Sequence, residues 1–110
     1  MELKVGDLCK HFKGESLIEK NIYEIVAMNV IYTGENAKVP IENLVVYRNI
    51  FQENKFFARE YNDLVAELSE EKQKKYEQTY RVQKLTDEEI EIIKTPKFIK
   101  EKKEYMEDKR

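Results

Sequence analysis

Asn43-Leu-Val-Val-Tyr-Arg48 is the stretch that decides the fold. It is the most β-prone segment of the chain, and it ends in an aromatic ring followed by a guanidinium. A short apolar run between Pro40 and the polar residues 52–55 is typical of a strand that is buried on both faces. We therefore predict a central strand here, with the other strands assembled beside it.

Four further segments have strand patterns. They are residues 3–14, the long run 22–33, residues 56–61, and residues 80–85, which would close the sheet. The run 22–33 is apolar on both alternating faces, which is typical of a curved strand shared by two layers. Gly34-Glu35-Asn36 predicts a turn. The predicted fold is mainly β: a small SH3-like, partly open β-barrel of about five strands that spans residues 1–85.

The pattern becomes helical after Tyr61. Asn62 can cap a short helical turn, and residues 69–79 fit either an exposed helix or a solvated loop. Thr86 and Glu89 have the spacing of a capping box, so a C-terminal helical extension is predicted over residues 86–110. Four of its apolar residues fall on one side of a charged helix: Phe98, Ile99, Tyr105 and Met106. This side packs either on the barrel or on a partner, including a homodimer formed through residues 96–109.

Composition limits the class of protein. The chain has 110 residues, of which 41% are hydrophobic and 38% are charged, so a single folded domain is expected. The net charge of −2 does not favour general binding to DNA or to membranes. The single cysteine, the lack of a signal-like leader and the lack of a long apolar run favour a cytoplasmic protein without a membrane segment.

Several short motifs follow one another in a fixed order. They are His11-Phe12-Lys13-Gly14, Tyr23-Glu24-Ile25, Leu44-Val45-Val46-Tyr47-Arg48 and Phe57-Ala58-Arg59. In this order the chain resembles, over roughly residues 8–85, the small bacterial and phage family named domain of unknown function 1653. The resemblance implies a small, strongly curved, SH3-like β structure and brings no activity. Glu60 stands where that family has proline, and the loops after Gly14 and around Gly34 are longer here.

The same motifs contain the candidate binding residues His11, Lys13, Tyr47, Arg48 and Arg59. Arginine offers a rigid fork to phosphate or carboxylate, and lysine adds a point charge. A tyrosine ring can stack on a base. We predict an anion-binding surface, with nucleic acid or a nucleotide as the first ligand class. The alternative is structural: Arg48 and Arg59 pair with Glu24, Glu42 or Glu60, and His11 caps a turn.

Other function classes have less support in the sequence. Cys9 and His11 are the candidate reactive groups of an enzyme, but neither has a recognisable partner, and Cys9 is predicted to be a buried apolar residue. One histidine with scattered carboxylates lacks the spacing of metal ligands, so no metal or cofactor is expected. The second hypothesis is a protein-interaction or assembly module that acts through exposed barrel aromatics or the C-terminal helix.

Overall fold

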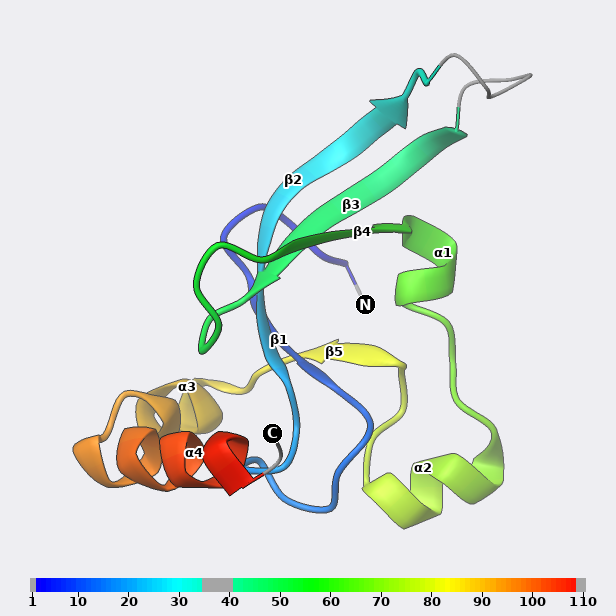
Figure 1. Ribbon diagram of the computed structural model, residues 1–110. Coiled ribbons are helices and arrows are strands. Elements are labelled where there is room, and N and C mark those ends of the chain that lie inside the picture. Colours follow the sequence, from blue (N-terminus) through cyan, green and yellow to red (C-terminus); the bar gives the residue numbers. More distant parts are fainter. Residues whose placement is uncertain (1, 35–40, 109–110) are drawn as a thin grey trace.

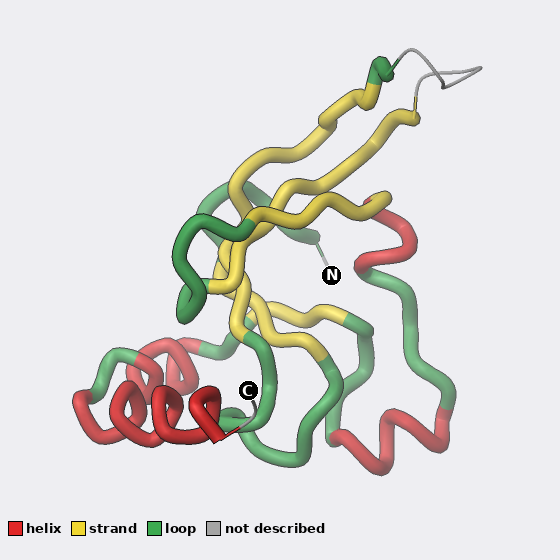
Figure 2. Tube along the Cα trace, in the orientation of Figure 1, coloured by secondary structure: helices red, strands yellow, loops and turns green. Residues whose placement is uncertain are grey.

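The computed structural model describes residues 2–34 and 41–108 (Figures 1 and 2). The five strands are β1 (Leu8–His11), β2 (Ile22–Tyr32), β3 (Ile41–Asn49), β4 (Phe56–Glu60) and β5 (Val82–Lys84). The four helices are α1 (Tyr61–Leu64), α2 (Glu70–Tyr76), α3 (Asp87–Ile93) and α4 (Pro96–Asp108). The segment 69–79, which fitted a helix or a loop, therefore contains a helix. Residues 35–36 of the predicted turn, Pro40 and residues 109–110 of the tail lie outside the described ranges.

The strands form one antiparallel sheet in the order β4-β3-β2-β1-β5. Strand β5 pairs with β1, so β4 and β5 are the two edges and the sheet is not closed within the described ranges. The prediction of a mainly-β barrel is thus met only in part, because the fold is a curved antiparallel sheet with four helices. The predicted central strand, β3, does have neighbours on both sides, but the middle of the sheet is β2.

The curvature has a local cause in β2 and β3. Asn29 and Asn43 have positive φ angles of 55° and 59°, a conformation that asparagine tolerates better than most residues. Both lie where the register between the two strands shifts, which is the signature of β-bulges. Bulges increase strand bending, and beyond them the β2–β3 hairpin projects from the rest of the molecule (Figure 1).

The register assigns side chains to the two faces of the sheet. Tyr47 lies opposite Ile25 on one side and Phe57 on the other, so these three residues share a face. Arg48 lies opposite Glu24, and both therefore point to the other face. In β3 the odd-numbered residues Val45 and Tyr47 are buried, whereas the alternate residues are only half-buried. The expectation of burial on both faces is thus met on one face only.

Each face has its own apolar core. The first core lies beside Tyr47 and contains Leu3, Cys9, Ile25, Val45, Tyr47, Leu64 and Val82. The second core lies under α3 and α4 and contains Ile22, Leu85, Ile93 and Phe98. Phe51 packs against the second core, and its ring lies 6.1 Å from the ring of Phe98. The capping box predicted at Thr86 and Glu89 is confirmed and begins α3.

Two buried lysines fix the connection between β1 and β2. The Nζ of Lys102, in α4, donates to the backbone oxygens of Ile18 and Lys20 at 2.5 and 2.6 Å. The Nζ of Lys20 donates to the backbone oxygens of Phe12 and Tyr76 and to the side chain of Gln78, each at 3.1 Å. The two side chains therefore tie α4 and the end of α2 to the same connecting segment.

Within the described ranges, none of the helices has the length and apolar character needed to cross a bilayer.

We predict that Lys102→Ala lowers the free energy of unfolding by about 2 to 4 kcal/mol, because it leaves a cavity and removes the ammonium donor from one buried and one partly buried carbonyl group. Lys102 is only 1% exposed, whereas the next residue, Lys103, is exposed on the same helix. Lys103→Ala is therefore the matched control and should change stability by less than about 0.5 kcal/mol. Urea denaturation measures both variants, and equal losses would contradict the role of the Lys102 ammonium.

Candidate functional site

The sheet separates the five predicted binding residues. Tyr47 and Arg59 lie on one face, because Arg59 is opposite Val45 and Tyr47 is opposite Phe57. Arg48 lies on the other face, where its Nε contacts the Oε1 of Glu24 at 2.8 Å. The structural alternative weighed for Arg48, an ion pair with Glu24, is thus present. The structure does not bring Arg48 together with Arg59.

His11 and Lys13 lie at the end of β1. The Nδ1 of His11 accepts a hydrogen bond from the backbone N–H of Lys13 at 3.3 Å, so the imidazole caps the turn that follows the strand. Burial, and then the charges of Lys13, Arg59, Arg81 and Lys20, lower the pKa of His11 to about 4. The imidazole is therefore neutral at physiological pH and offers hydrogen bonds rather than a positive charge.

Aromatic rings join His11 to Arg59 across four strands. The ring of His11 is edge-on to that of Tyr23 at 6.5 Å, and Tyr23 is edge-on to Tyr47 at 4.8 Å. Phe57 is stacked on Tyr47 with 5.7 Å between the ring centroids. We call His11, Tyr23, Tyr47, Phe57 and Arg59 the aromatic face. Its members come from β1, β2, β3 and β4, so it exists only once the sheet has formed.

Arg59 supplies the positive charge of the aromatic face. Burial raises the pKa values of Tyr23 and Tyr47, and the Arg59 charge acts in the opposite direction on both phenols. The Nε of Arg59 pairs with the Oδ2 of Asp63 at 3.4 Å, one helical turn further along the chain. More than a third of both side chains is exposed, so this ion pair is weak and an incoming phosphate can compete for the guanidinium.

The ring that a ligand can reach is not the one predicted. Tyr47 is only 8% exposed, because it lies in the first core and beneath Phe57. Phe57 is 41% exposed and is the accessible stacking surface. The alternation of β4 put Phe57 on the same side as Arg59, but only the pairing of β4 with β3 shows that Phe57 covers Tyr47.

Arg81 was not predicted as a site residue. It precedes β5, and its backbone oxygen accepts a hydrogen bond from Phe12 at 2.9 Å. Its charge is among those that lower the pKa of His11, and its buried Nε has no hydrogen-bond partner among the described residues. Arg81 therefore adds a second guanidinium near the His11 end of the aromatic face. Its sequence neighbours alternate as in any strand, so nothing in the sequence singles out this position.

Cys9 was considered as a reactive group, and carboxylates with the single histidine as metal ligands. Cys9 is fully buried, and burial, with a smaller effect of Asp7, raises the pKa of its thiol to about 12. At neutral pH the nucleophilic thiolate is therefore scarcely populated. In the part of the chain that the structure describes, no three His, Cys, Asp or Glu side chains come close enough to hold a metal ion.

Comparison with family models, with curated proteins and with solved structures finds no match to this chain. The resemblance of residues 8–85 to the domain of unknown function 1653 family stays a prediction from the motifs.

We predict that His11 makes the protein less stable in mild acid. Its folded pKa of about 4 lies below the 6.5 of an ordinary histidine, so between these values the unfolded chain binds more protons and acidification favours unfolding. From about pH 7 to about pH 5 the wild type should lose on the order of 1 to 2 kcal/mol through this group. His11→Asn keeps a turn-capping oxygen and should lose correspondingly less, as urea denaturation at both pH values would measure. An identical loss in the variant would contradict the prediction.

Proposed function

We propose that this chain is a non-catalytic binding module whose ligand carries both an anionic group and a flat ring, with nucleic acid or a nucleotide as the first ligand class. The observation that supports this most is that Arg59 and the exposed ring of Phe57 lie on the same face of β4, which also carries the rings of Tyr47 and Tyr23. In this proposal Arg59 binds phosphate, and Lys13 adds charge near His11. We also assign the curved sheet to the SH3-like, partly open barrels.

The chemistry of the aromatic face suits such a ligand. Bases stack on exposed aromatic side chains, and Phe57 is held from behind by Tyr47 at 5.7 Å and by Tyr23 at 6.3 Å. A ring that is already fixed loses little conformational freedom when a ligand stacks on it. The guanidinium of Arg59 matches the oxygen pairs of a phosphate, and neutral His11 adds hydrogen-bonding capacity. Because Cys9 is buried and the Nδ1 of His11 is occupied by the turn, we assign neither a catalytic role.

A second function, protein interaction, has its own supporting observation. The β2–β3 hairpin exposes about half of Ile31, Tyr32 and Ile41, which are 53%, 51% and 50% accessible. Exposed apolar side chains on a projecting hairpin suit a protein partner or a second copy of the chain. The two functions differ in their response to salt: phosphate binding weakens as ionic strength rises, whereas an apolar interface scarcely responds. Light scattering at low and high salt would detect self-association of the second kind.

We predict that Arg59→Gln weakens the binding of a short single-stranded oligonucleotide by about tenfold, because a charge-assisted contact to phosphate is lost. The slope of log affinity against log salt should also fall by about 0.7, the value for one contact on a single strand. Amide chemical-shift titration, or anisotropy of a labelled strand at several salt concentrations, measures both quantities.

Arg48→Gln is the matched control for that experiment. It removes the same charge from the neighbouring strand, but on the opposite face of the sheet, where Arg48 pairs with Glu24. Its affinity and salt slope should stay within about twofold of the wild type, the change expected when no phosphate contact is lost. If both variants weaken binding equally, the effect is one of overall charge, and the aromatic face is not the site.

A second matched pair tests stacking. Phe56 and Phe57 are adjacent, are 60% and 41% exposed, and point to opposite faces of β4. We predict that Phe57→Ala costs on the order of 1 to 3 kcal/mol of binding free energy, the contribution of one stacked base, and that Phe56→Ala costs little. Circular dichroism checks that both variants remain folded. If Phe56→Ala and Phe57→Ala lose the same affinity, the base does not stack on Phe57.

A further inference from the structure

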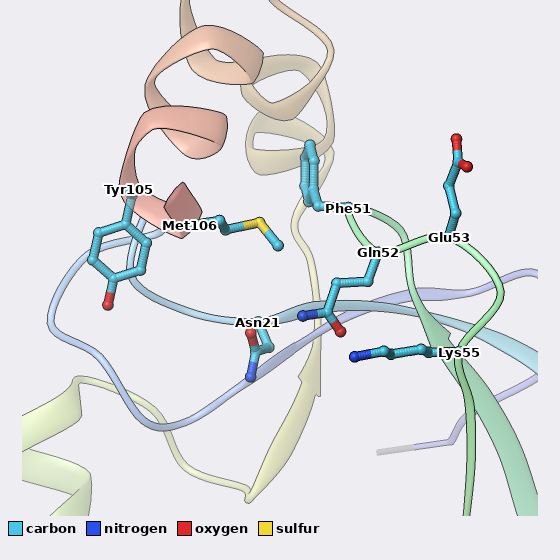
Figure 3. A pocket seen from close by; sticks show the side chains of 7 residues that line it. All are labelled: Asn21, Phe51, Gln52, Glu53, Lys55, Tyr105 and Met106. Atoms are coloured by element: carbon cyan, nitrogen blue, oxygen red, sulfur yellow. The ribbon is translucent and has the colours of Figure 1, made fainter. Parts of the chain in front are cut away.

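A pocket of about 570 Å³ lies between the chain that follows β3 and the end of α4 (Figure 3). Its lining consists of Asn21, Phe51, Gln52, Glu53, Lys55, Tyr105 and Met106. This volume is within the range of sites that hold small organic ligands, about 300–1,000 Å³. The lining combines two carboxamides, an ammonium group, a carboxylate, two aromatic rings and a thioether, so it is suited to a ligand that is flat and polar at its edge.

The side chains are arranged for such a ligand. In Figure 3 the amide of Gln52 and the ammonium of Lys55 lie near Asn21, whereas the carboxylate of Glu53 points away from them. The thioether of Met106 extends toward Phe51 and Gln52. The pocket therefore has an apolar side at Phe51 and Met106, and a polar side at Gln52, Asn21 and Lys55.

Lys102 contacts both aromatic walls of the pocket. Its Nζ lies 5.9 Å from the ring centre of Phe51 and 5.6 Å from that of Tyr105, both of which line the pocket. The same ammonium is anchored on the backbone oxygens of Ile18 and Lys20. The pocket is thus built on a buried, hydrogen-bonded group, which fixes the separation of its walls before a ligand binds.

Asn21 connects the pocket to the aromatic face. Its Oδ1 accepts a hydrogen bond from the Nδ2 of Asn49 at 3.4 Å, and it stands two residues before Tyr23 in the chain. Tyr23 and Asn49 are opposite one another on β2 and β3, on the same face as Tyr47. The ring of Tyr23 lies 6.3 Å from that of Phe57, and Asn21 lines the pocket, so Phe57, Tyr23 and Asn21 connect the aromatic face to the pocket.

We infer that the pocket is a subsite for one unpaired nucleobase, and that the ligand is a single-stranded nucleic acid that extends from the aromatic face into the pocket. This inference rests on the proposed function. The amides of Asn21 and Gln52 match the mixed donors and acceptors along the edge of a base, and Lys55 is placed for the attached phosphate. A base in a duplex has this edge occupied by its partner, so the subsite selects single strands.

The test uses the full chain and oligothymidylates of increasing length, up to about eight nucleotides, which lies within the site sizes of small single-strand-binding folds. Affinity should rise by at least about fivefold at the length that first reaches the pocket. At that length the side-chain amide signals of Asn21 and Gln52 should shift. A duplex of the same length should bind more weakly.

Two variants isolate the subsite. Gln52→Ala and Lys55→Gln should each remove most of the gain with length while leaving the shortest strand, bound through Arg59, unchanged. Lys94→Gln is the matched control. Lys94 is an exposed lysine that pairs with Glu91 at the end of α3, so its substitution removes the same charge at a position away from the pocket. It should retain the full gain.

The outcomes separate this inference from the proposed function. If binding depends on Arg59 but does not tighten with length, or if the signals of Asn21 and Gln52 stay in place, the subsite is wrong and the anion-binding face stands. If the gain with length survives in both pocket variants, the base lies elsewhere and the subsite is again wrong. If none of the strands binds, the proposed function fails and the inference fails with it.

Discussion

The segment between β1 and β2 is held by two buried ammonium groups, and the remaining architecture depends on it. Lys102 reaches it from α4 and Lys20 reaches out of it toward the end of α2, so the two helical parts of the chain are fixed to one connection. Nearly all of these hydrogen bonds go to backbone carbonyl oxygens that are buried or partly buried and need a donor. Burial lowers the pKa values of both lysines, to about 8 for Lys102, so part of the gain from these bonds offsets the desolvation of the charges.

This connection also lies between the two apolar cores. On one face of the sheet, α3 and α4 cover Ile22 and Leu85 and make the second core. On the other face, the first core is bordered by the half-buried ring of Tyr23 and the exposed ring of Phe57. Asn21 lies where the two regions meet, because it follows Lys20 and precedes β2. The buried lysines therefore position Asn21, which lines the pocket and stands two residues before Tyr23 of the aromatic face.

Local features of the fold were predictable from the sequence, whereas long-range pairing was not. The capping box at Thr86 and Glu89, the alternation of Phe57 and Arg59, and the burial of Cys9 follow from residue type and spacing. The pairing of β5 with β1 depends on contacts between distant parts of the chain, so the sequence predicted the last strand but not its neighbour, and the partly open barrel is met only in part. Lys102 was missed because a lysine in a strongly charged helix has the pattern of a solvated residue, and only the packing of α4 reveals its burial.

In the candidate site, too, residue types were predictable from the sequence, whereas the face on which each residue lies depended on strand pairing. Adjacent residues of β3 point to opposite faces, so Tyr47 and Arg48 were never able to serve one surface once the strand was paired on both sides. With Arg48 on the far face and His11 neutral, Arg59 and Lys13 are the cations left from the predicted set. A face with so few charges, on a chain whose net charge is −2, cannot hold a polyanion through charge alone. In the proposed function, recognition therefore comes mainly from stacking on Phe57 and from polar groups around Asn21, which favours exposed bases over a continuous phosphate surface.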